Sequence, residues 1–170
     1  HGRAVEAPLA EGRDGRKARR FDGRGHIAVE KSASLDPAVK GWTVEVACKP
    51  EKETGIVLAC GGRTNGYALH LVEGRPAFTV VVQNRPVRIV GRESVVGRWV
   101  TLTGRIRPDE SIELVVDGES VARGRATGPM RTPNEALQIG ADLGSPVLDS
   151  PTPHFVGLIE SARIYSGIVP

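Results

Sequence analysis

The chain has 170 residues, 39% of them hydrophobic, and a formal net charge of +3 at neutral pH. That length suffices for one domain with a real core and is short for two. No apolar run approaches the ~20 residues that cross a membrane, so membrane insertion is not expected.

Short segments rich in Val, Ile, Leu and Thr recur about every ten residues, each bounded by Gly, Pro, Asn or Asp. Such spacing is typical of an all-β sandwich. We expect residues 1–11 to form an N-terminal extension, 12–170 to form the domain, and any helix to be a short piece near 34–39. The predicted strands are 26–30, 42–49, 55–60, 67–73, 76–83, 87–91, 99–106, 111–117, 119–125, 136–142 and 155–165.

One dense basic cluster, Arg13 to Arg20, precedes the first predicted strand. It could be a nucleic-acid arm or a solvated entry strand. The second interpretation is favoured because no aromatic side chains interleave with the basic ones. We therefore expect no nucleic-acid partner.

Alternation within the strands assigns an inner and an outer face. The outer faces hold Thr43, Glu45, His70, Thr79, Val81, Gln83, Thr101, Thr103 and Glu113. The inner faces hold Trp42, Val44, Val46, Cys48, Tyr67, Leu69, Leu71, Phe78, Val80, Val82, Val100, Leu102, Ile106, Ile112, Leu114 and Val116. One sheet should thus present a band of Thr, His and Gln to water, and Trp99 should join the other aromatic residues in the core.

The two cysteines, Cys48 and Cys60, could form one disulfide in an exported protein. If their strands form a hairpin around residues 50–54, Cys48 lies opposite Ile56 and Cys60 opposite Val44. The two thiols are then about four residues, or ~13 Å, apart along the strands, which is too far for a bridge.

Nine segments follow one another in a specific order: FDGRGHIAVEKSASLD, WTVEVACKP, GIVLACGG, GYALHL, GRPAFTV, GRWVTLTG, IELVVDGESVA, ALQIGAD and FVGLIESARIY. From about Gly12 to Tyr165 the chain resembles the laminin-G-like, concanavalin A-like jelly-roll family, in the bacterial form attached to sulfatases, glycoside hydrolases and surface proteins. The resemblance implies a two-sheet antiparallel sandwich whose first strand, in the FDGRGHIAV region, pairs with its last, FVGLIESARIY.

The same resemblance implies a structural calcium ion that joins the first strand to the last through hard oxygen ligands. Asp22 and Glu160 occupy the corresponding positions. The other interpretation, an Asp in a tight turn and a Glu on an exposed strand face, remains open.

Catalysis is not expected. Glycosidases on this type of sandwich need paired carboxylates along one strand, and Glu45 stands alone on its strand while Glu51 and Glu53 lie in a turn. The sequence contains no Gly-x-Ser-x-Gly motif and no His pair at metal-ligand spacing.

Sugar binding is the function we expect, because lectin sites on this fold use polar side chains that hydrogen-bond hydroxyl groups. The other interpretation of the same side chains, an ordinary water-facing sheet face, remains open. The candidate residues are Asn65, His70, Gln83, Asn84 and Arg85, and the basic composition favours an extended acidic polysaccharide. We expect a non-catalytic binding module beside a neighbouring domain of a longer polypeptide, since the sequence starts at His1 with no leader. An extracellular, periplasmic or surface location fits. The alternative is a structural or adhesion domain with protein contacts and no glycan site.

The cysteine geometry makes a prediction. Denatured but unreduced protein should titrate with two free thiols, because Cys48 and Cys60 lie out of register. Mass spectrometry of the unreduced protein tests this, and a Cys48–Cys60 bridge would contradict it.

Overall fold

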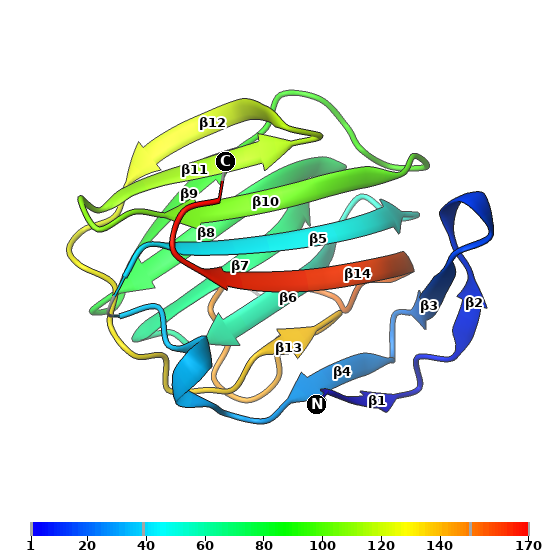
Figure 1. The fold of residues 1–170 in the computed structure, drawn as a ribbon, viewed down its shortest axis with the longest axis horizontal. Helices are drawn as coiled ribbons and strands as arrows, with labels where there is room; N and C mark the ends of the chain where they lie inside the picture. The colour runs from blue at the N-terminus through cyan, green and yellow to red at the C-terminus, as the bar shows by residue number, and fades with distance from the viewer. Residues whose placement is uncertain (1, 39, 150, 170) are drawn as a thin grey trace.

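The computed structural model describes residues 2–38, 40–149 and 151–169. They form two seven-stranded antiparallel sheets packed face to face, with sheet A in the order β1-β4-β13-β6-β7-β8-β9 and sheet B in the order β12-β11-β10-β5-β14-β3-β2 (Figure 1). The strands are β1 Gly2–Val5, β2 Leu9–Glu11, β3 Lys17–Asp22, β4 His26–Val29, β5 Trp42–Pro50, β6 Gly55–Gly61, β7 Asn65–Val72, β8 Arg75–Val82, β9 Arg85–Val90, β10 Val100–Ile106, β11 Ser111–Val116, β12 Glu119–Arg125, β13 Gln138–Ile139 and β14 Val156–Ser166.

The all-β prediction is confirmed, and each predicted strand has a counterpart. The segment predicted at 136–142 shrinks to the two-residue β13. Three N-terminal strands were missed, because β1 is exposed along its whole length and β3 buries only Ala18 and Phe21, three positions apart. Residues expected to form an extension thus add β1 to sheet A and β2 to sheet B.

Among residues 2–38, 40–149 and 151–169, helical structure is limited to two three-residue 3₁₀ segments, η1 at Arg13–Gly15 and η2 at Ala33–Leu35. No helix in the described part of the chain is long and apolar enough to cross a membrane.

The last strand lies in the interior of sheet B. β14 pairs with β5 along its length and with β3 through its first four residues, Val156–Ile159. The predicted pairing of the first and last strands is therefore right for Phe21 and Asp22 and wrong for HIAV. The chain turns at Gly23–Gly25, and His26–Val29 enters sheet A as β4.

The inner faces meet in one apolar core, as the alternation predicted. Across this core the indole N–H of Trp42 in sheet B donates a hydrogen bond of 2.9 Å to the hydroxyl oxygen of Tyr67 in sheet A. Trp99 was wrongly placed in the core. It lies just before β10, is only half-buried, and is not one of the core residues.

The two cysteines are free and buried, in agreement with the expected thiols. The hairpin register was wrong, however, because β5 belongs to sheet B and β6 to sheet A. Burial raises the pKa of Cys48 to about 12 and that of Cys60 to about 11. Both side chains are therefore neutral thiols at neutral pH.

Close packing of the two sheets at one glycine makes a stability prediction. A Cβ atom on Gly104 of β10 would lie 2.6 Å from the buried ring of Phe78 in β8. Gly104→Ala should therefore lower the free energy of unfolding by about 1–3 kcal/mol. Urea denaturation measures this, with Gly128→Ala as the control, because a Cβ there meets its nearest atom at 3.6 Å. Equal stability of the two variants would contradict the tight contact.

Candidate functional site

A loop covers the outer face of sheet A. It joins β13 to β14 and comprises the described residues 140–149 and 151–155, here called the cover loop. Its Val147 is buried in a second apolar cluster with four residues of β6, β7 and β8, and Leu148 packs against that cluster. The central strands of sheet A are consequently buried on both faces. The four strand residues are Ile56, Ala59, Ala68 and Val81.

The cover loop is fastened by side chains near its start. The carboxylate of Asp142 accepts a 2.7 Å hydrogen bond from the N–H of Val147. The amide of Gln138 both donates to the carbonyl of Leu143, at 3.0 Å, and accepts from its N–H, at 2.8 Å. At the far end, the N–H of Ile56 donates to the carbonyl of Pro153 at 3.0 Å.

Between the cover loop and strands β7 to β9 lies a groove of about 520 Å³. This volume is within the range of small-ligand sites. The described lining combines hydroxyl groups, one imidazole, charged side chains and proline rings, and no other aromatic side chain is among these residues. It is formed by Thr54, His70, Leu71, Val72, Glu73, Thr79, Pro86, Arg88, Val147, Leu148, Asp149, Pro151, Thr152 and Pro153.

His70 lies at the floor of this groove. The sequence placed it on a water-facing band, but the cover loop leaves it only 1% exposed and its neighbour Thr79 2% exposed. The ring Nε2 of His70 shares a 2.9 Å hydrogen bond with the Thr79 hydroxyl. Burial, and then the charge of Arg88, lower the pKa of His70 to about 4. The imidazole is therefore neutral at neutral pH, and its Nε2 is engaged with Thr79.

Arg88 brings positive charge to the same place. It lies on β9 directly opposite Thr79 and is exposed. Sequence analysis missed Arg88. Side chains two residues apart on a strand share a face, so Arg88 could have been expected on the same face of β9 as Pro86. Asp149 of the cover loop was missed as well. The sequence feature that could have pointed to it is the adjacent apolar pair Val147–Leu148, which stands out in a proline-rich loop.

The other predicted ligand-binding residues gather elsewhere, at one end of sheet A. Gln83 and Asn84 have φ values of 50° and 62° and form the two-residue turn between β8 and β9. The side-chain oxygen of Asn65 accepts from the N–H of Gln83 at 3.0 Å, and exposed Arg85 opens β9. Asn65 is five residues from His70 along β7, or about 17 Å. The predicted set therefore divides into two groups.

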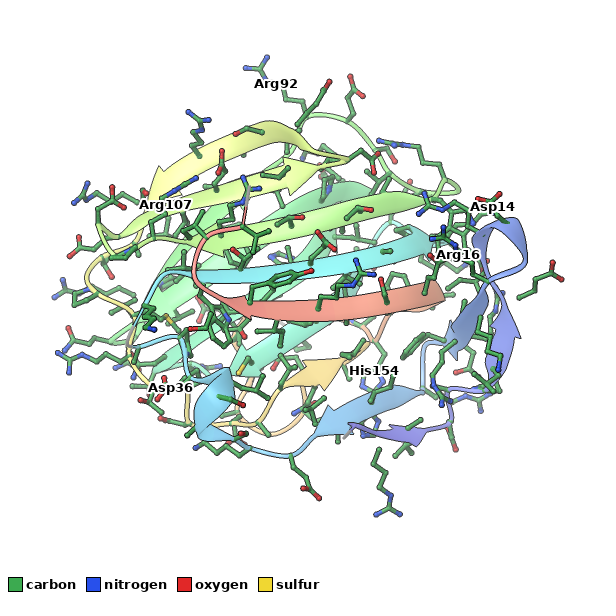
Figure 2. All side chains as sticks on the ribbon, in the orientation of Figure 1. Asp14, Arg16, Asp36, Arg92, Arg107 and His154 are labelled. Carbon is green, nitrogen blue, oxygen red and sulfur yellow. The ribbon has the colours of Figure 1, made fainter. Side chains whose placement is uncertain are left out.

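The outer face of sheet B is also less exposed than predicted. Glu113 is 2% exposed and accepts hydrogen bonds from Arg105, Arg107 and Arg123. Burial would raise the pKa of Glu113, but hydrogen bonds from Ser120, Arg107 and Arg105 hold it at about 2. Arg107 is labelled in Figure 2 near one end of strands β10 and β11. Thr43 is buried beneath the C-terminal segment and donates to the carbonyl of Gly167 at 2.9 Å.

Asp22 and Glu160 do not come together as a calcium pair. Asp22 pairs with Val156 across β3 and β14, four residues or about 13 Å along the strand from Glu160. Asp22 binds the N–H and guanidinium of Arg24. Glu160 lies at a β-bulge and binds Arg13 N–H and the Arg16 guanidinium. These residues do not fit one shared ion, and no group of three or more His, Cys, Asp or Glu side chains within the described residues could hold a metal.

The basic cluster at 13–20 is largely engaged within the protein. Arg20 forms a two-contact salt bridge with Glu51, at 2.6 and 2.8 Å, and Arg19 donates to the carbonyl of Ala7. Arg16, labelled in Figure 2 beside the start of β14, pairs with Glu160 at 3.4 Å.

Two antiparallel sheets, with the last strand between β5 and β3 and a loop over the outer face of one sheet, define a jelly-roll β-sandwich of the concanavalin A type. The chain belongs to the concanavalin A-like lectin/glucanases superfamily, whose laminin G-type family model matches residues 8–169. No curated protein matches its sequence.

Several solved structures share this fold. Domains LG4–5 of the mouse laminin alpha1 chain match with a TM-score of 0.72 and 18% identity over 93% of this chain and 41% of that one. The binding domain of Paraclostridial Mosquitocidal Protein 1 matches with 0.77 and 12% identity over 99% and 45%. Domain 4 of a GH43 extracellular arabinanase from Geobacillus stearothermophilus, in complex with arabinotriose, matches with 0.69 and 20% identity over 98% and 82%. The chain spans less than half of the first two structures. At these identities the likeness shows the fold alone.

The fastening of the cover loop makes a pH prediction. Burial raises the pKa of Asp142 from 3.8 to about 6, so the folded chain holds this proton more tightly than the unfolded chain does. The contribution of Asp142 to the free energy of unfolding is greatest below about pH 4 and falls as the pH rises to about 6. Asp142→Asn cannot ionise and should lack this fall.

Calorimetry at several pH values checks the prediction. The melting temperature of Asp142→Asn, relative to the unmodified protein, should rise between about pH 4 and 6.5. Asp149→Asn, an exposed change in the same loop, is the control. A difference that stays constant over this range would show that the Asp142 proton is not held by folding.

Proposed function

We propose that the chain is a non-catalytic carbohydrate-binding module and that the groove beneath the cover loop is its sugar site. The observation that carries this proposal is the groove itself, whose lining combines the exposed Arg88 with His70 and Thr79, a hydrogen-bonded pair buried at its floor. Sugars offer many hydroxyl groups that both donate and accept, and a mixed polar lining can match them.

The groove favours weak and reversible binding. Apart from the buried imidazole of His70, none of the described residues that line it offers an aromatic ring for stacking on a sugar face, so affinity rests on a few hydrogen bonds in a wet site. A Kd between micromolar and millimolar, about −8 to −4 kcal/mol, is expected. Arg88, together with the net charge of +3, favours glycans that carry carboxylate or sulfate groups.

The carboxylates of the groove support a role without catalysis. A glycosidase acid needs sheltered surroundings that keep it protonated. Glu73 is 79% exposed and salt-bridged to Arg75 at 2.7 Å, and Asp149 is exposed on the cover loop. Neither carboxyl group lies in such surroundings.

An appended, extracellular setting completes the proposal. The arabinanase domain that shares the fold belongs to an extracellular enzyme and was solved with arabinotriose, and this chain covers 82% of that domain. By analogy, the present module would hold a neighbouring domain of a longer exported polypeptide against a polysaccharide. A structural calcium ion forms no part of this proposal, because Asp22 and Glu160 do not converge.

Isothermal titration calorimetry against a panel of glycans tests the site. The panel contains arabinotriose and neutral and acidic polysaccharides, each at two salt concentrations. Arg88→Ala should weaken binding of a glycan ligand by about tenfold, with an unchanged melting temperature, and salt should weaken acidic ligands most. Arg85→Ala, at the far end of sheet A, is the matched control and should have no effect.

Two other results would redirect the proposal. If a glycan binds and only Arg85→Ala or Gln83→Ala weakens it, the site is the turn between β8 and β9. If no glycan in the panel binds, the adhesion alternative with protein contacts gains support.

A further inference from the structure

In the described part of the chain, β14, the last strand in sequence, lacks a neighbouring strand on one side over part of its length. β5 pairs with β14 as far as Ser166, but β3 pairs only with Val156–Ile159. From Ser161 to Ser166 the side of β14 that faces away from β5 has no neighbouring strand in the described part of the chain (Figure 1). In an antiparallel pair alternate residues direct their N–H and C=O groups away from the partner, so this edge presents backbone hydrogen-bonding groups.

An apolar groove of about 450 Å³ opens beside the same edge. It lies where β14 of sheet B and the β4–β13 side of sheet A come apart, with η2 at one end. Its walls are Gly2, Ile27, Val29, Leu35, Leu137, Ile139, Ala162 and Ile164. Ile27, Val29, Leu35, Ala162 and Ile164 are only partly buried although they pack against the main core. The groove therefore leaves apolar surface in contact with water.

The other sheet edges are protected in ways that this one is not. β9 and β12, the outer strands on the opposite side, pack against each other and carry charged side chains such as Arg88 and Arg123. β1 and β2 are four and three residues long. Short length and charge are the usual protections against unwanted strand pairing. The open part of β14 has one charged residue, Arg163, and its guanidinium pairs with Glu45 on the outer face.

The open edge of β14 and the apolar groove together determine which class of ligand fits. A sugar would leave the apolar walls unmatched, and a hydrocarbon chain would bury the backbone groups of β14 without partners, which is costly. An extended peptide satisfies both, because its backbone can pair with the edge while alternate side chains enter the groove. The open stretch of six residues spans about 20 Å, enough for about three inserted side chains.

We propose that this edge groove, formed by β14 from Ser161 to Ser166 with the β4–β13 side of sheet A, docks an extended segment of a partner polypeptide. The segment pairs with β14 in the position that continues β3 and inserts an apolar side chain at every second residue. This surface is separate from the sugar groove on the outer face of sheet A and does not depend on it.

A displayed library of random eight-residue peptides, selected on the folded protein, tests the proposal. Sequences with alternating apolar residues should be enriched. Ala162→Leu, which fills the groove from β14, should weaken the selected peptides by about tenfold. Arg163→Ala, one residue away on the outer face, is the matched control and should leave binding unchanged. Both variants are compared only at matched melting temperature.

Two further measurements identify the mode of binding. N-methylation of the selected peptides at alternate residues should abolish binding in one register only, because only half of the peptide N–H groups face β14. Hydrogen exchange should slow at those amides of residues 161–166 that face away from β5. The proposal is overturned if the library yields no enrichment over an empty support. It is overturned as well if the selected peptides bind Ala162→Leu and the unmodified protein with equal affinity. It is also overturned if N-methylation has no effect in both registers.

Discussion

The central strands of sheet A are buried on both faces, and the remaining features of the molecule depend on this constraint. All seven residues of β6 are buried, so an element outside the sandwich must cover them. The cover loop does so with Val147 and Leu148. Where that cover is incomplete, the polar side chains of β7, β8 and β9 form the floor of a groove. The candidate site is therefore a gap in the packing over a sheet face, and Asp142 helps to hold its border in place.

Much of the fold could be predicted from local patterns, because alternation and turn chemistry act over a few residues. The turns at Glu73–Gly74 and Asp117–Gly118 have the positive φ angles that a two-residue hairpin needs. The choice of sheet for each strand is not local. The segment between β5 and β6 looks like a hairpin turn in the sequence, yet the chain crosses there from sheet B to sheet A.

The candidate site was less predictable for the same reason. His70 and Thr79 alternate with core residues, which predicts exposure, and the loop that buries them comes about seventy residues later in the chain. Polar side chains on a strand show which face they occupy and carry no information about what covers that face. Arg88 is the residue that links the predicted polar band to the groove, since β9 places it opposite Thr79.

The position of β14 also has a consequence for how the protein acquires its structure during synthesis. Sheet B needs β14 between β5 and β3, and Ser161 pairs with Ala47 more than a hundred residues earlier. While a ribosome is still making the last strand, β5 has an unpaired edge and the core lacks the side chains that β14 contributes. Such non-local pairing is slow compared with local contacts. The sandwich can close only after residue 166 has left the ribosome, so the nascent chain depends on staying soluble with an open sheet until then.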